Sequence, residues 1–194
     1  IQQSLQLYPA QDDWDRLWWI NTLLCDFYHW SDSSRITYKK CVDKQHMILE
    51  QLGDRCMLAL TLSKLGLHAV EEFRFPDAIE LQKKALSIIN DICSESDRSF
   101  ILSSVAMTEG MCGLFQQSNE HGVLALKIAR EFGSNRDLRY SLISTNYSAL
   151  HLGHYDVAIF GQNEAIRVGK MFRFEWDGEL YGLLGMALLA NNEW

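Results

Sequence analysis

The sequence predicts an all-α protein: a right-handed solenoid of antiparallel helix pairs with about ten helices. The first observation is a repeated spacing of small residues, because Gly66, Ala78 and Ala85 are separated by 12 and then 7 residues. The same spacing recurs in Gly110, Gly122 and Ala129, in Asn146, Ala158 and Ala165, and more loosely in Thr22, Ser34 and Cys41. A fixed internal spacing with a variable gap between copies is typical of helix–turn–helix repeats. The second observation is that 2 prolines and 12 glycines provide few turn signals for a sheet-rich fold.

The expected helices follow from apolar periodicity and from stop signals. A proline stops the segment 1–8, the segment 13–29 is apolar on more than one side, and the segment 31–52 ends at a glycine. Pro76 opens a later helix in a tolerated first-turn position. The remaining helices are expected over 55–73, 76–92, 97–117, 120–132, 136–152, 155–171 and 177–190.

We expect one repeat domain over residues 1–194, cut from a larger protein. The chain starts at Ile1 without a methionine, and both ends fall inside a repeat. The expected copies are a partial repeat 1–9, repeats at about 13–53, 55–94, 97–134 and 136–172, and a partial repeat 176–194.

The chain resembles the tetratricopeptide repeat family, in which two antiparallel helices carry small residues where they approach closest. At 8–10 Å between helix axes a crossing leaves no room for a larger side chain. The matching residues are Trp18 for the first aromatic, Leu65 and Gly66 for the Leu-Gly step, Ala78 and Ala85 for the paired alanines, and Leu184 and Gly185 for the next step.

Two departures from the family pattern are informative. The usual tyrosine of the first helix is replaced by Cys25, Ala69, Gly113 and Ala149. Successive copies are spaced by 44, 44, 36 and 39 residues, which is longer than the family norm. This long-repeat form is similar to the arrays of bacterial signal-transducing ATPase regulators and of animal polarity adaptors.

Composition excludes several classes of partner. The net charge of −7 and the pI near 5.3 argue against a nucleic-acid surface and against anionic membranes. No apolar run approaches the roughly 20 residues that span a bilayer. The five cysteines are odd in number and form no C-x-x-C motif, so we expect reduced, mostly buried thiols in a cytoplasmic protein.

No pattern for catalysis or for a bound cofactor stands out. The sequence has no phosphate-binding glycine loop with lysine, no nucleophile elbow and no H-E-x-x-H. His151 and His154 are the only close histidine pair, and they straddle an expected helix end beside Gly153. We therefore expect no enzyme activity, no metal site and no cofactor.

The resemblance implies that the first helix of each pair lines a concave groove. The groove residues carried over from it are Arg16, Trp19, Leu23, Leu67, Met107, Met111, Tyr140, Ile143 and Tyr147. This lining lacks the Lys-and-Asn pair with which chaperone-docking members hold a C-terminal carboxylate. Two interpretations stay open: the apolar stripe is a docking face for an amphipathic helix or apolar peptide, with adaptable methionines, or it is core.

The expected function is a non-catalytic, protein- or peptide-binding scaffold module of a larger regulatory protein. Arg16 and Tyr140 would orient the partner, and the apolar groove residues would anchor it. The alternative is a domain of a bacterial transcriptional regulator that senses a ligand or a signal peptide. Neither function involves nucleic acid or a membrane as a partner of this segment.

Overall fold

A computed structural model describes residues 40, 43, 44, 46–50, 53–89, 93–171 and 178–192. Within these residues the regular secondary structure is helical and contains no strand, so the all-α expectation is confirmed for this part of the chain. Residues 46–50 are helical and precede the first helix with defined bounds. The helices expected over 1–8 and 13–29 lie outside the described residues.

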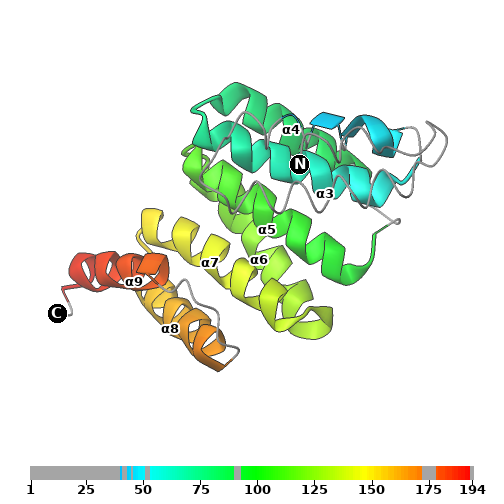
Figure 1. Cartoon of the computed structure of the whole chain (residues 1–194). Coiled ribbons are helices and arrows are strands. Elements are labelled where there is room, and N and C mark those ends of the chain that lie inside the picture. The colour runs from blue at the N-terminus through cyan, green and yellow to red at the C-terminus, as the bar shows by residue number, and fades with distance from the viewer. Residues whose placement is uncertain are drawn as a thin grey trace, which may run out of the picture.

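The helices follow one another as helix–turn–helix units (Figure 1). Their bounds are α3 (Arg55–Glu71), α4 (Phe75–Ile88), α5 (Glu95–Met111), α6 (Phe115–Phe132), α7 (Asn135–His151), α8 (Tyr155–Met171) and α9 (Gly178–Ala190).

The helices form two layers. α3, α5, α7 and α9 each contact the next in turn and make up the first layer (Figure 1). α4, α6 and α8 make up the second layer, and each packs against its own first helix and against the first helix of the following unit. No backbone contact joins α4, α6 and α8 to one another in the described part of the chain.

The structural period is 40 residues, which corrects the expected spacings of 44 and 36. α3, α5 and α7 begin at positions 55, 95 and 135, and α4, α6 and α8 begin at 75, 115 and 155. The structural equivalent of Gly66 and Asn146 is therefore Ala106, one helical turn before Gly110. Residues one turn apart lie on the same face of a helix, so Gly110 and Ala106 share a face of α5. The spacing of small residues could therefore be matched to Gly110, one turn away from the true equivalent.

Each first helix ends with the same backbone turn. The residue two positions after the helix has a positive φ after all four first helices: 60° at Phe73, 82° at Gly113, 80° at Gly153 and 59° at Asn192. After α3, α5 and α7 the following amide then donates to a carbonyl five residues back, as from Leu114 to Glu109 at 2.8 Å. This is the Schellman pattern of helix termination. It corrects the helix expected over 97–117, because Gly113 ends α5.

The helix starts repeat as well. Asp54, Ser94 and Ser134 are the N-caps of α3, α5 and α7 and lie 40 residues apart. Each side chain accepts a hydrogen bond from the amide three residues on, as from Met57 to Asp54 at 3.0 Å. Such a cap contributes about 1 kcal/mol.

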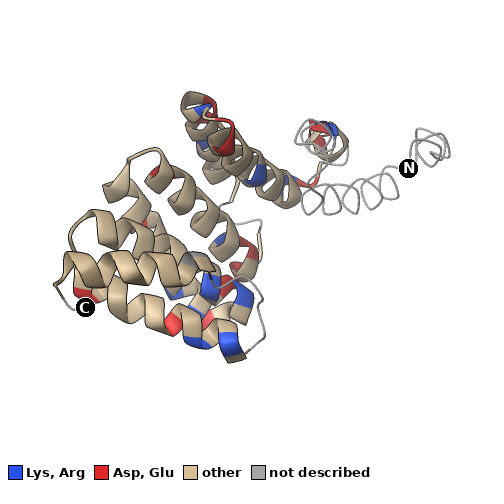
Figure 2. Cartoon of the chain, turned by 60° about the vertical axis from the view of Figure 1, so that its left-hand side comes forward, with Lys and Arg blue, Asp and Glu red and all other residues tan. Residues whose placement is uncertain are grey.

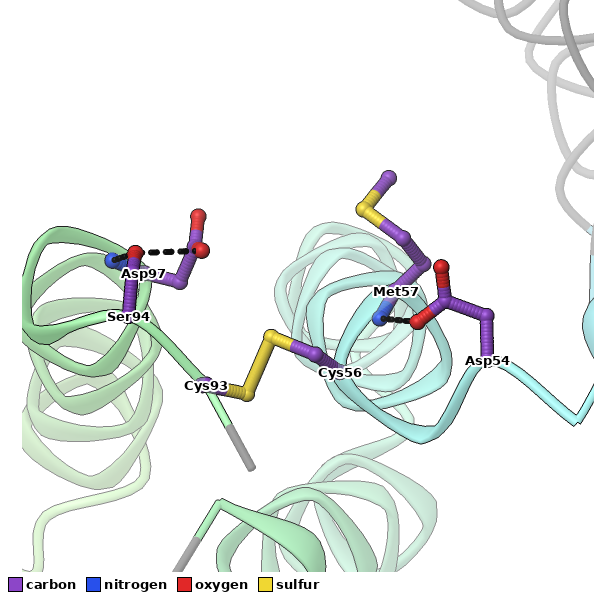
Figure 3. The surroundings of a disulfide bond; sticks show 6 residues. All are labelled: Asp54, Cys56, Met57, Cys93, Ser94 and Asp97. Carbon is purple, nitrogen blue, oxygen red and sulfur yellow. Dashed lines mark hydrogen bonds between the residues drawn. A yellow bond between two sulfur atoms is a disulfide. The ribbon is translucent and has the colours of Figure 1, made fainter. Parts of the chain in front are cut away.

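Cys56 and Cys93 form a disulfide, which corrects the expectation of reduced cysteines (Figure 3). Their Cα atoms are 5.2 Å apart although 37 residues separate them in sequence. Cys56 lies in the first turn of α3 and Cys93 directly precedes the N-cap of α5, so the stacking of units brings them together. Cys112 is a free, half-buried thiol, and Cys25 and Cys41 lie outside the described residues.

Candidate partner-binding site

The first layer presents two rows of equivalent side chains. Successive first helices place Leu60, Phe100 and Tyr140 in one row, at intervals of 40 residues. The second row consists of Leu67, Met107 and Tyr147, all half-buried. Both rows cross α3, α5 and α7, so a segment lying over this face would contact three units at once.

A cleft of about 300 Å³ lies over the N-terminal halves of these helices. Its lining comes from all three first helices and from the N-cap of α7. The lining residues are Met57, Leu60, Thr61, Lys64, Ser96, Asp97, Phe100, Ser134, Arg136 and Asp137. The cleft therefore combines an apolar floor with a charged rim.

Arg136 is held over two aromatic rings. Its guanidinium carbon lies 5.2 Å from the ring centre of Phe100 and 5.8 Å from that of Tyr140. The two rings themselves meet edge to face with centres 5.7 Å apart. Cation–π contacts at these distances restrict the guanidinium while leaving its N–H donors available for a partner.

The carboxylates of the cleft are engaged by local hydrogen bonds. The buried carboxylate of Asp137 accepts from the Ser134 amide at 2.9 Å and from the Ser96 hydroxyl at 2.6 Å. Asp97 accepts from the Ser94 hydroxyl at 2.6 Å. These bonds cap α7 and α5 and, through Ser96, join the two helices.

Among the described residues, the cations of the cleft have no carboxylate partner. Neither Lys64 nor Arg136 makes an ion pair within the part of the chain that the structure describes. Elsewhere acidic and basic segments are interspersed rather than gathered into one field (Figure 2). The cleft is thus a local site with two available positive groups on a chain of net charge −7.

The groove residues expected from the sequence are distributed between surface and core. Met111 and Tyr140 are exposed, and Leu67, Met107 and Tyr147 are half-buried. Ile143 is only 6% exposed and belongs to a core cluster with Leu142, Ile166 and Leu183, against which Met107 and Tyr147 pack. Arg16, Trp19 and Leu23 lie outside the described residues.

Sequence reasoning missed most of the cleft. Phe100, Lys64 and Arg136 were not among the expected groove residues. Phe100 is the equivalent of Tyr140 in the 40-residue period, so the correct register would have identified it. Arg136 lies two residues after the N-cap Ser134, and no local pattern distinguishes it from other exposed arginines.

The histidine pair near the end of α7 is not arranged as a metal site. The His151 ring stacks on the Phe115 ring with centres 4.5 Å apart and lies 4.7 Å from the Tyr147 ring. Among the residues that the structure describes, no three His, Cys, Asp or Glu side chains are grouped so that they could hold a metal ion.

A larger hollow of about 780 Å³ lies on the second layer. Arg130 of α6 lines it, and its remaining lining residues all belong to α8. Arg130 reaches across it to Glu164 at 2.7 Å, so one of the two arginines that line it is already paired. We favour the smaller cleft because three helices build it and because two aromatic rings hold its arginine.

Comparison of the sequence with protein-family models and with curated proteins finds no match. None of the described helices is both long enough and apolar enough to cross a membrane.

Proposed function

We propose that the chain is a non-catalytic module that binds a protein or peptide segment across its first layer of helices. In this proposal the helix pairs form a right-handed, tetratricopeptide-like solenoid with the first layer on its concave side. The 40-residue period and the two layers support it, because first helices touch one another while second helices do not. Such wider spacing on one side is what curves a solenoid.

The observation that carries the proposal is Arg136 stacked on Phe100 and Tyr140 at the edge of the cleft. Arginine and aromatic residues dominate the energetics of protein interfaces. A guanidinium already held by two rings loses little freedom when it binds, so the site is preorganised.

The lining indicates the chemistry of the partner. Lys64 and Arg136 favour carboxylate side chains, and Met57, Leu60 and Phe100 favour apolar ones. We therefore propose a segment in which acidic and apolar residues alternate. The second row, which consists of Leu67, Met107 and Tyr147, would extend the contact along the same face.

Selection from a displayed library of random peptides tests this function. We expect enriched peptides to carry acidic and apolar residues and to lose affinity by at least about tenfold in Arg136→Glu and in Lys64→Glu. Lys127→Glu on α6 is the matched control and should change affinity by less than about twofold, apart from the general effect of charge. Equal binding by all three variants would place the site elsewhere.

Sensing of a small ligand or short signal peptide is the second candidate function. The cleft volume of about 300 Å³ favours it, since this is the lower end of the range for small-molecule sites. Shortening a selected peptide to its central residues distinguishes the two roles. A sensor domain would bind the shortened peptide with unchanged affinity. A scaffold that contacts its partner through three helix pairs would lose most of its affinity for the shortened peptide.

The cytoplasmic location expected from the sequence stays a prediction. Disulfides persist mainly in oxidising compartments, so the Cys56–Cys93 bond favours such a compartment instead. Alkylation of free thiols in the protein taken from its native source decides between the two locations.

A further inference from the structure

Phe73 occupies a backbone conformation in which the turns after α5 and α7 have glycine and the turn after α9 has Asn192. Its φ is 60°, and the turns after α5 and α7 place Gly113 and Gly153 at 82° and 80°. A bulky residue in this left-handed region is a genuine outlier, because its Cβ crowds the backbone. Strained residues of this kind are concentrated where function requires them.

Burial does not explain why phenylalanine is present. The Phe73 side chain is 81% exposed, which makes it the most exposed of the large apolar residues in the described part of the chain. It contacts the exposed Phe75 edge to face, with ring centres 6.3 Å apart and an angle of 88° between the planes. The turn therefore presents two aromatic rings to solvent.

The apolar surface continues onto the next unit. Cys112, just after α5, packs against the core cluster formed by Ala69 and Val70 of α3 and Ala78 of α4. The α3–α4 and α5–α6 turns accordingly lie at the same edge of the molecule (Figure 1). Exposed Met111 and Leu114 flank the second turn.

The segment that carries the aromatic pair is rich in carboxylates. Segment 71–80 contains four carboxylates and one arginine, whereas the equivalent segments 111–120 and 151–160 contain one carboxylate each and no arginine or lysine. Arg74 donates to Glu72 at 2.8 Å and to Asp77 at 2.6 Å, and Glu80 pairs with Lys84 at 2.7 Å. A net negative charge remains at the turn, where Glu71 and Glu72 also lie 3.4 Å from the two ring nitrogens of the buried His68.

We propose that this turn is a docking site for an apolar segment of a partner protein that carries flanking basic residues. Aromatic faces and carboxylates attract lysine and arginine together, and the exposed rings supply the apolar contact. The site is distinct from the cleft, because Phe73 lies beyond the C-terminal end of α3, whereas the cleft residues of α3 lie between Met57 and Lys64.

Fluorescence polarisation with a defined probe tests the proposal. The probe is a labelled peptide of about 14 residues in which lysine pairs alternate with leucine pairs and one tryptophan is included. We expect binding by the full chain and a loss of at least about tenfold in Phe73→Gly. Because glycine suits the left-handed turn, this variant should fold, and a circular-dichroism melt checks that it does. If it does not fold, Phe73→Asn replaces it, since asparagine tolerates the same region.

Three controls separate the proposed contact from general attraction. Phe132→Ala removes another exposed aromatic, and Arg136→Glu alters the cleft, so both should stay within about twofold of wild type. The same peptide with glutamate in place of lysine should bind at least about tenfold more weakly. The proposal is overturned if the wild type does not bind the lysine peptide, if Phe73→Gly binds it like the wild type, or if both peptides bind equally. A self-association that Phe73→Gly abolishes would overturn it too, because the occupant would then be a second copy of the chain.

Discussion

At the residue scale, packing distance decides which glycines the helices require. A methyl group on Gly122 of α6 would lie 3.2 Å from the Cα and 2.9 Å from the hydroxyl of Thr145 on α7. A methyl group on Gly182 of α9 would meet no atom within 4 Å. The same residue type thus marks a close approach of backbones in one helix and open space in another.

We predict that Gly122→Ala and Gly182→Ala change stability in opposite directions. Gly122→Ala should lower the free energy of unfolding by about 1–3 kcal/mol, because α7 must move away from α6. Gly182→Ala should raise it by up to about 1 kcal/mol, because alanine favours a helix and nothing obstructs it. Urea titrations of both variants measure the difference, and a stabilising Gly122→Ala would contradict the packing of α6 on α7.

At Phe73, the cost of the backbone conformation is about as large as the gain from side-chain contact. Its left-handed backbone costs about 1–2 kcal/mol relative to glycine. The edge-to-face contact with Phe75 contributes about 0.5–1.5 kcal/mol of stability, which offsets part of this cost. Folding alone therefore gains little or nothing from phenylalanine at this turn, and an interaction with a partner would account for it.

At the element scale, buried glutamines join consecutive units. The Gln82 amide donates to the Ser63 carbonyl at 3.1 Å and to the Thr108 hydroxyl at 2.7 Å, which links α4 to α3 and α5. Its equivalent Gln162 donates to the Leu180 carbonyl of α9 at 3.0 Å and accepts from Asn146 at 3.1 Å. The middle unit has Gly122 at this position and relies on the close approach of α6 to α7 instead.

The pairing of α5 with α6 includes a histidine–carboxylate contact. His121 Nδ1 lies 2.7 Å from an oxygen of Glu109, whose side chain is nearly buried. The hydrogen bond to Glu109 raises the pKa of His121 above its usual value, against the opposing effect of burial. A raised pKa means that the contact stabilises the fold fully below about pH 6.5, the ordinary histidine pKa, and loses this effect as pH rises through the folded pKa.

We predict that this contact makes stability depend on pH. The difference in unfolding free energy between wild type and His121→Gln should be on the order of 1 kcal/mol at pH 5.5, at the low end for charged hydrogen bonds because His121 is partly exposed. The difference should shrink as the pH rises towards 9. Urea titrations at several pH values measure it, and a difference that grows with pH would show that the histidine acts through another contact.

At the scale of the whole molecule, the disulfide ties one end of the first layer together. It joins the first turn of α3 to the segment that enters α5, beside the cleft residues Met57 and Asp97 (Figure 3). A closed loop of 37 residues reduces the entropy of the unfolded chain, which corresponds to at most about 4 kcal/mol of stability.

We predict that reduction lowers the unfolding free energy by about 2–4 kcal/mol. A variant with Cys56→Ser and Cys93→Ser should match the reduced wild type and should not respond to reductant. Cys112→Ser is the control and should behave like the wild type, since Cys112 is a free thiol. Urea titrations with and without dithiothreitol make the measurement, and equal stability of the oxidised and reduced wild type would contradict the bond.

Much of the helical organisation in the described residues was predictable. Ala78, Ala85, Ala158 and Ala165 mark buried positions on the second-layer helices, as their spacing indicates. The register of the middle unit was not predictable, because Ala106 and Gly110 are both small and lie on one helix face. Phe100 of the cleft escaped for the same reason, since it is equivalent to Leu60 and Tyr140 only at a period of 40 residues.

The sequence by itself determined that these residues form helices with small residues at the crossings, because helix periodicity and side-chain size act over a few turns of chain. Only the tertiary structure decided which turns of neighbouring helices lie opposite each other. The pairing of Cys56 with Cys93, the cleft under Arg136 and the exposed rings of Phe73 and Phe75 all depend on that stacking. Such contacts join residues from different units, and no local pattern along the chain records them.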